Sequence, residues 1–324
     1  MSRSRASAPA KVILFGEHFV VYGNPAILAS INRRIVVDAH TIDENKILIK
    51  SDIGFAGEYS SLGFKATEGD MEAKATLDPL YSAVMQVLAA RNKKTGIKIA
   101  ISSGVPPGIG LGSSAAACVS TVAAVNSLFQ KRYSRQKVCE LAIESERLIH
   151  KNSSGADCYV STFGGLIHYS KIKGFKKIRA KGRLALVIAS TGVRHSTGDI
   201  VADVKKLKDR NESVFQSLAK QAASICAQAQ GAIASGKRDE LGALMNENQM
   251  ILRQIGVSHY KADKLIEICS KAGALGAKIT GAGGGGAVIA LAASRLDGGK
   301  IASRADAAGY ESFEVEIDRK GLVV

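Results

Sequence analysis

The feature that most limits what this chain can fold into is a proline- and glycine-rich loop that runs directly into a helix. The loop follows an expected strand over 97–102 and reads Pro106-Pro107-Gly108-Ile109-Gly110-Leu111-Gly112-Ser113-Ser114. The next residues, Ala115 to Phe129, are almost all small or apolar, which predicts a buried helix. Alternating glycines allow left-handed backbone and leave no Cβ to exclude a ligand. Because a helix start offers unpaired N–H groups and roughly half a positive charge, the loop predicts a phosphate site.

This loop differs from two commoner phosphate-binding loops. A P-loop ends in Gly-Lys-Ser or Gly-Lys-Thr, and no lysine follows Gly112. A dinucleotide fingerprint needs a third glycine where Ser113 stands. Ser113 and Ser114 lie where a hydroxyl could cap the helix or bind a metal ion held by phosphates. The alternative is a glycine-rich turn before a capped helix, without a ligand.

Composition sets the class of protein. The chain has 324 residues, 46% of them hydrophobic, which is enough for one large or two ordinary domains. No apolar run approaches the roughly 18 residues that span a bilayer, so we expect no membrane partner. Met1–Ala10 has the composition of a transit peptide but is too short and leads at once into an apolar strand. Together with five scattered cysteines, typical of reduced thiols, this predicts a cytoplasmic protein.

The formal net charge of +15 allows three interpretations. It could mark a nucleic-acid partner, attract polyanionic substrates, or be a general property of the source. Aromatic residues make up only 5% of the chain, so base-stacking surfaces are sparse, which argues against nucleic-acid binding.

The basic stretch 171–183, which we expect to be irregular, indicates a domain boundary that divides the chain into 1–180 and 181–324. A loop or weak hairpin is expected over 54–76. Strands are expected over 12–15, 34–40, 46–51, 166–169, 184–189, 287–291 and 312–317. Helices are expected over 77–91, 134–149, 212–235, 238–254, 260–273 and 298–308.

Several polar residues interrupt this pattern. Lys11, Glu17 and His18 flank the first strand and form either a pocket rim or three solvated strand ends. Glu146 lies beside the inner face of the 134–149 helix and could point into a site or into solvent. Asp157 follows a small flexible turn and is either a turn cap or a reactive carboxylate.

Two later segments also indicate a binding site. The turn from Ser190 to Thr197 is rich in hydroxyls and contains Arg194 and His195, so it could hold a carboxylate or serve as a helix cap. The run Gly281–Gly286 lies between two expected strands. Glycines there have no packing use, so we expect them to let the backbone approach a ligand closely.

The order of these motifs resembles the GHMP kinase superfamily. Pro106–Ala116 is similar to its ATP loop, and Ala277–Ala287 is similar to its third motif. Within the superfamily, Ala8–Gly23 and Glu146–Gly165 resemble the mevalonate kinases, and the resemblance covers most of the chain. Departures are Ala10 for a usual glycine, Tyr22 for a frequent histidine, and Cys158 for a common asparagine or threonine.

The resemblance implies an α+β, two-domain GHMP kinase fold, with an N-terminal domain related to a ribosomal-protein fold and a ferredoxin-like C-terminal domain. It implies ATP-dependent phosphorylation of (R)-mevalonate to (R)-5-phosphomevalonate, by a homodimer. Alternatives are another kinase of the superfamily, for phosphomevalonate or homoserine, and more distantly a nucleic-acid-binding protein.

The resemblance also implies residue roles. Asp157 is the base and Lys11 lies between it and the transferred phosphate. Ser114 and Glu146 match ligands of Mg²⁺. The nucleotide contacts are Pro106, Pro107, Gly108, Ile109, Gly110, Leu111, Gly112, Ser113, Ser114, Ala115 and Ala116. The substrate contacts are Lys11, Glu17, His18, Asp157, Arg194 and Thr197.

Overall fold

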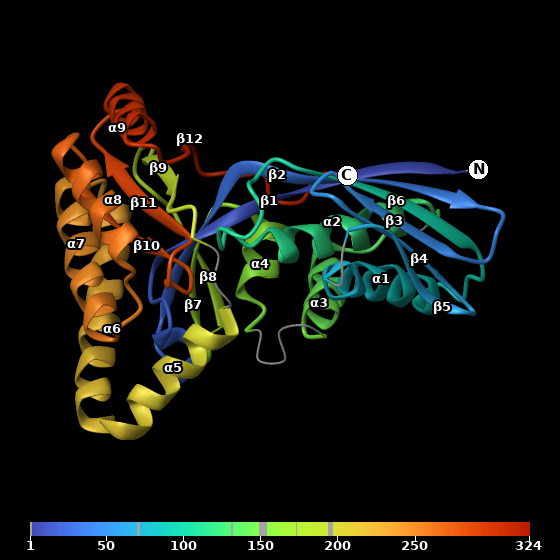
Figure 1. The fold of residues 1–324 in the computed structure, drawn as a ribbon, viewed down its shortest axis with the longest axis horizontal. Coiled ribbons are helices and arrows are strands. Elements are labelled where there is room, and N and C mark those ends of the chain that lie inside the picture. Colours follow the sequence, from blue (N-terminus) through green and yellow to red (C-terminus); the bar gives the residue numbers. More distant parts are fainter. Residues whose placement is uncertain (1, 70–71, 131, 149–153, 173, 194–196) are drawn as a thin grey trace.

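The computed structural model describes residues 2–69, 72–130, 132–148, 154–172, 174–193 and 197–324. These residues form two sheets, each covered by helices (Figure 1). The first sheet has the strand order β5-β4-β3-β6-β2-β7-β8, with β1 paired to β2. Its strands are β1 (Arg3–Phe15), β2 (Ala26–Ile42), β3 (Ile47–Ser51), β4 (Phe55–Ser60), β5 (Gly63–Glu68), β6 (Gly96–Ser103), β7 (Leu166–Ser170) and β8 (Gly174–Ile178).

The two long strands β1 and β2 are the axis of this sheet. They pair from Arg3 opposite His40 to Phe15 opposite Ile27. The expected first strand, 12–15, was therefore too short. The strand was predicted from apolar side chains alone. Backbone pairing with β2 extends it to Arg3 and Arg5, whose side chains are exposed.

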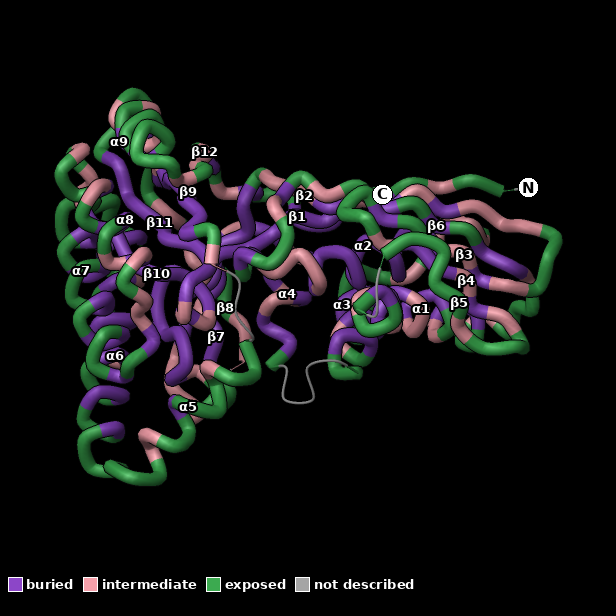
Figure 2. The backbone as a smooth tube through the Cα atoms, viewed as in Figure 1, coloured by how far each residue is buried: buried purple, intermediate pink, exposed green. Residues whose placement is uncertain are grey.

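Four α-helices belong to this part of the fold: α1 (Ala73–Ala90), α2 (Ser113–Ser127), α3 (Arg135–Glu146) and α4 (Ala156–Phe163). Helix α2 packs on β1 and β2, and all its residues from Ala115 to Asn126 are buried (Figure 2). A short 3₁₀ helix, η1 (Phe19–Tyr22), follows β1. Ser134 caps α3 by accepting a hydrogen bond from the Lys137 amide.

Other expectations for this region need correction. The 54–76 segment contains the β4–β5 hairpin, which was one of the two alternatives. Helix α1 begins four residues before the expected start, because Ala73 is buried with Leu77 and Pro79 is tolerated inside the helix. The 171–183 stretch is not all irregular, since its residues 174–178 form β8 and pair with β7.

The second sheet is antiparallel, in the order β10-β11-β9-β12. Its strands are β9 (Ala185–Ser190), β10 (Gly276–Thr280), β11 (Ala287–Ala292) and β12 (Ser312–Val315). Its helices are α5 (Thr197–Arg210), α6 (Glu212–Ser235), α7 (Arg238–Gln254), α8 (Tyr260–Lys271) and α9 (Arg295–Ala307). A strand, helices, two strands, a helix and a final strand in this order are ferredoxin-like, so the predicted fold class is confirmed.

The last residues return to the first sheet. Asp318 forms an ion pair with Arg34 of β2, and the Ser7 amide donates to the Val323 carbonyl at 2.7 Å. The residues after β12, 316–324, thus contact β1 and β2 of the first sheet. The domain boundary near residue 180 stays a prediction. Within the described ranges, no helix combines the length and apolar character needed to cross a membrane. All five cysteines are free and buried.

Candidate active site

The glycine loop joins β6 to α2 and is anchored by its apolar residues. Ile109 and Leu111 are buried, whereas Gly108 and Gly110 are exposed. Gly108, Gly110 and Gly112 have φ values of 77°, 81° and 68°, the left-handed region that favours glycine. The exposed face of the loop therefore consists largely of backbone, as a phosphate cradle requires.

Helix α2 begins directly at this loop. Its N-cap is Gly112, so neither Ser113 nor Ser114 is the cap, and the capping interpretation of these serines was wrong. Both serines lie half-buried in the first turn, followed by the buried Ala115 and Ala116. Amides in the first turn have no partner within the helix, so the loop presents N–H groups and two hydroxyls together.

Lys11 and Asp157 meet beside the loop. The Lys11 Nζ lies 3.2 Å from the Asp157 Oδ2, with side-chain exposures of 5% and 31%. The Lys11 amide donates to the Leu111 carbonyl at 2.8 Å, which ties β1 to the loop. Asp157 lies in the first turn of α4, and its side chain remains partly exposed beside the buried Lys11.

Glu146 ends α3 and is buried, at 5% exposure. The Cys158 Sγ donates to its Oε2 at 3.5 Å. Burial raises the pKa of Cys118 and of Cys158, and the Glu146 charge raises both further. Glu146 thus lies close to Cys118 of α2 and Cys158 of α4, and Cys118 is one helical turn along α2 from Ser114. Burial decides against the solvent-exposed alternative that the helical pattern left open.

Glu17 forms an ion pair with Lys278 of β10, and both side chains are completely buried. Burial raises the pKa of Glu17 and lowers that of Lys278, and their mutual attraction opposes both shifts. Lys278 also donates to the Ile279 carbonyl at 2.7 Å. The second carboxylate oxygen of Glu17 has no hydrogen-bond partner among the described residues. Sequence reasoning missed Lys278; the available signal was a lysine inside an otherwise apolar strand.

His18 connects the first strand to the late glycine run. Its Nε2 lies 2.7 Å from the Ala282 carbonyl, so Nε2 carries the proton of the neutral ring. The Thr280 hydroxyl bonds both the amide and the carbonyl of Ile13. A Cβ on Gly281 would lie only 3.4 Å from the Gly110 carbonyl oxygen. The two glycine motifs therefore face each other across the two sheets.

Burial lowers the pKa of His18 below its usual 6.5. Above pH 6.5 the ring is neutral in both the folded and unfolded protein; below it, the unfolded protein takes up the proton first. Stability should therefore fall as pH drops from 7 towards 5. We expect a smaller loss in His18→Asn, because asparagine does not titrate in this pH range. Asparagine is chosen because it tolerates a positive φ, which is 61° at this position. Thermal melts at several pH values would test this, and parallel curves for the two proteins would contradict it.

The structure does not test the roles of the two other predicted substrate residues, Arg194 and Thr197. Thr197 is exposed at the start of α5, and no hydrogen bond or ion pair joins it to Lys11 or Asp157 among the described residues. Arg194 lies outside the described residues, as does His195.

Comparisons with known proteins show the family to which this chain belongs. The family described as GHMP kinases N terminal domain matches residues 79–165, and GHMP kinases C terminal matches 229–311. The chain is 39% identical to the mevalonate kinase of Pyrococcus furiosus, over 98% of this chain and 97% of that protein. It is 36% identical to the mevalonate kinase of Thermococcus sibiricus, over 99% of this chain and 98% of that protein. The chain belongs to the mevalonate kinase family of the GHMP kinases.

Solved mevalonate kinases share the fold of this family member. The L. major mevalonate kinase in complex with R-mevalonate has a TM-score of 0.83 and 30% identity, and covers 98% of both chains. The Methanococcus jannaschii enzyme has a TM-score of 0.80 and 26% identity, again over 98% of both chains.

Proposed function

We propose that this mevalonate kinase family member transfers the γ-phosphate of ATP to (R)-mevalonate, giving (R)-5-phosphomevalonate for isoprenoid synthesis. The observation that carries the proposal is the Lys11–Asp157 pair, 3.2 Å apart beside the glycine loop and the start of α2. A carboxylate and an ammonium side by side would suit a point at which a hydroxyl attacks a phosphate. The mevalonate kinases of Pyrococcus furiosus and Thermococcus sibiricus match this chain over 98% and 99% of its length.

The chain's residues act by positioning and charge. Asp157 accepts the proton of the substrate's primary hydroxyl while the hydroxyl oxygen attacks the γ-phosphorus of ATP. The bond from the γ-phosphorus to the bridging oxygen then breaks, and ADP leaves. Lys11 stabilises the negative charge on the transferred phosphate. The ion pair with Asp157 and the hydrogen bond from the Lys11 amide to the glycine loop hold Lys11 in place. Loop amides and the start of α2 hold the remaining phosphates.

Magnesium is a further part of the proposal. The Ser114 hydroxyl and the Glu146 carboxylate are hard oxygen donors on adjacent elements. In the described part of the chain, no group of three or more His, Cys, Asp or Glu forms a metal cage. This donor set suits Mg²⁺, which is usually held by one or two carboxylates with substrate phosphates and water. Bound there, the ion would neutralise phosphate charge.

Substrate contacts and cellular setting are also proposals. Burial raises the pKa of Glu17, and the charges of Lys278 and Lys11 oppose that shift, so Glu17 lies close to Lys11. The Glu17 oxygen without a hydrogen-bond partner among the described residues would accept a hydrogen bond from a substrate hydroxyl, and His18 would lie beside it. Arg194 and Thr197 would bind the far end of mevalonate. By resemblance we also propose two domains, 1–180 and 181–324, and a homodimer. Five free buried thiols support a reducing, cytoplasmic location.

Gly112→Ala should lower kcat/KM for ATP by about tenfold or more, because small displacements of reacting groups are costly. A Cβ there would lie 2.7 Å from Cγ and Cε of Lys11, at a left-handed φ of 68°. Gly110→Ala is the matched control: it has a similar φ of 81°, but its Cβ would meet nothing within 4 Å. Steady-state kinetics would compare the two, and equal losses would show that backbone strain alone matters.

The proposal is tested by ADP release from MgATP with mevalonate, 5-phosphomevalonate, homoserine and galactose. Turnover on mevalonate alone would support it. Turnover on a phosphorylated substrate would retain the mechanism but reassign the substrate. No turnover on any of them, with tight RNA binding, would favour the nucleic-acid alternative.

A further inference from the structure

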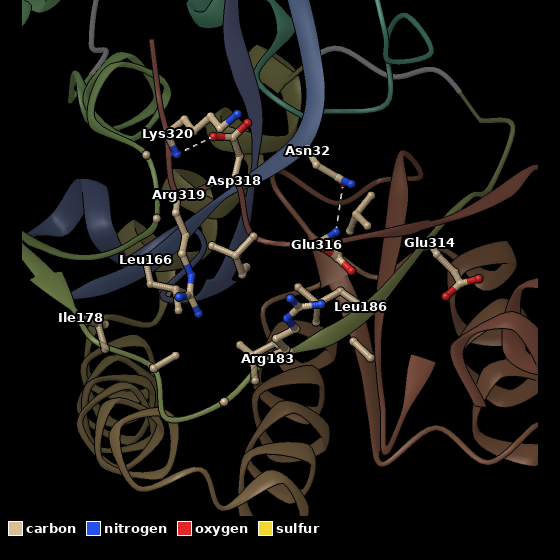
Figure 3. A pocket seen from close by; sticks show the side chains of 18 of the residues that line it. Asn32, Leu166, Ile178, Arg183, Leu186, Glu314, Glu316, Asp318, Arg319 and Lys320 are labelled. Carbon is tan, nitrogen blue, oxygen red and sulfur yellow. Dashed lines mark hydrogen bonds between the residues drawn. The ribbon is translucent and has the colours of Figure 1, made fainter. Parts of the chain in front are cut away.

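A large hollow lies between the two sheets, and its lining does not include the residues assigned to catalysis. Its volume is about 1260 Å³, enough for a ligand of nucleotide size. Its walls come from β7 and β8 of the first sheet, β9 and β12 of the second, and the tail after β12 (Figure 3). Lys11, Asp157 and the glycine loop do not line it.

The hollow is strongly basic. Eight Lys or Arg side chains and three Asp or Glu side chains line it, an excess of five positive charges. Asp318 is paired with Arg34, and Glu316 lies 3.9 Å from Arg295. Lys177 donates to the Phe163 carbonyl and Arg238 to the Ala293 carbonyl.

Four cations remain without a side-chain hydrogen bond or ion pair to any residue in the described ranges: Arg179, Arg183, Arg319 and Lys320. Arg183 lies between β8 and β9, and Arg319 lies in the tail. Both extend into the hollow (Figure 3). The planar guanidinium group matches phosphate through two parallel hydrogen bonds, so two convergent arginines suit a ligand with adjacent phosphates.

The tail that carries two of these cations is held rigidly. The Asp318 Oδ1 accepts hydrogen bonds from the amides of Lys320 and Gly321. A Cβ on Gly164 would lie 2.4 Å from the Gly321 nitrogen, so tail and first domain are closely packed. Arg319 and Lys320 thus project from a fixed backbone, which reduces the entropy lost on binding.

We propose that this hollow binds a small molecule carrying two or more phosphate groups, at a site separate from the catalytic one. No aromatic side chain lines it within the part of the chain that the structure describes, so it offers no surface for stacked bases of a nucleic-acid strand. Leu166, Ile178 and Leu186 form an apolar part of the wall beside the cations (Figure 3). The basic stretch 171–183 thereby gains a role that the kinase reaction does not require.

Isothermal titration of the full-length protein with inorganic pyrophosphate tests this. A saturating, non-hydrolysable ATP analogue occupies the catalytic phosphate site throughout. We expect one pyrophosphate per chain, bound at least about tenfold more weakly by Arg183→Gln/Arg319→Gln. The control Arg3→Gln/Arg304→Gln removes the same charge from exposed arginines outside the hollow and should bind like wild type.

Unfolding temperatures of both double variants should match wild type, since all four arginines are exposed. Lys320→Gln gives an independent readout and should also weaken binding. The proposal fails if the ATP analogue abolishes pyrophosphate binding, or if the control variant loses as much affinity. It also fails if an RNA oligonucleotide displaces pyrophosphate, because the site would then serve a nucleic acid.

Discussion

Asp157→Asn should lower kcat by about 10²–10⁴-fold, the usual contribution of a general base. Asparagine keeps the size of the side chain but cannot accept the proton of the substrate hydroxyl. It also removes the negative partner of Lys11, 3.2 Å away, without touching the glycine loop. ATP binding should therefore persist. Single-turnover kinetics with equilibrium ATP binding would separate the two effects.

Asp297→Asn is the matched control, because Asp297 also lies in the first turn of a helix, α9, far along the chain from the site. Its kcat should equal that of wild type. A wild-type kcat in Asp157→Asn would remove Asp157 from its role as base. Loss of ATP binding in the same variant would instead make the residue part of the nucleotide site.

Lys278→Met should lower the free energy of unfolding by about 3–5 kcal/mol, because it leaves the carboxylate of Glu17 buried without its partner. Methionine fills a similar volume, so the loss reports the charge and not a cavity. The pair connects the end of β1 to β10, so the loss should appear in the unfolding of both sheets. Denaturant titration followed by circular dichroism would measure it.

Adding Glu17→Gln to this variant should recover much of the lost stability, since no unpaired charge then remains buried. Lys271→Met is the control, because it breaks the exposed Lys271–Glu267 pair on α8 and should leave the unfolding midpoint nearly unchanged. If Lys278→Met were as stable as Lys271→Met, the buried pair would not hold the two sheets together.

Local chemistry made part of the site predictable. Glycine at alternate positions before an apolar helix has few other uses, so the glycine loop was evident from the sequence. The helices over 212–235 and 238–254 were predicted with their observed bounds. Each buries an apolar face, and a glycine follows its C-terminal end, Gly236 after the first and Gly256 after the second. The roles of Lys11, Asp157, Ser114 and Glu146 came from a family resemblance and stay predictions.

The sequence by itself determined the loop, most elements, the fold class and the family, because propensity, glycine spacing and motif wording are local properties. Only the tertiary structure decided which residues that are far apart in the sequence lie close together. It buried Glu146, paired Glu17 with Lys278, and placed Gly281 against Gly110. It also brought Arg183 and Arg319 into one basic hollow. These contacts depend on how two sheets pack against each other, which no periodicity within one segment encodes.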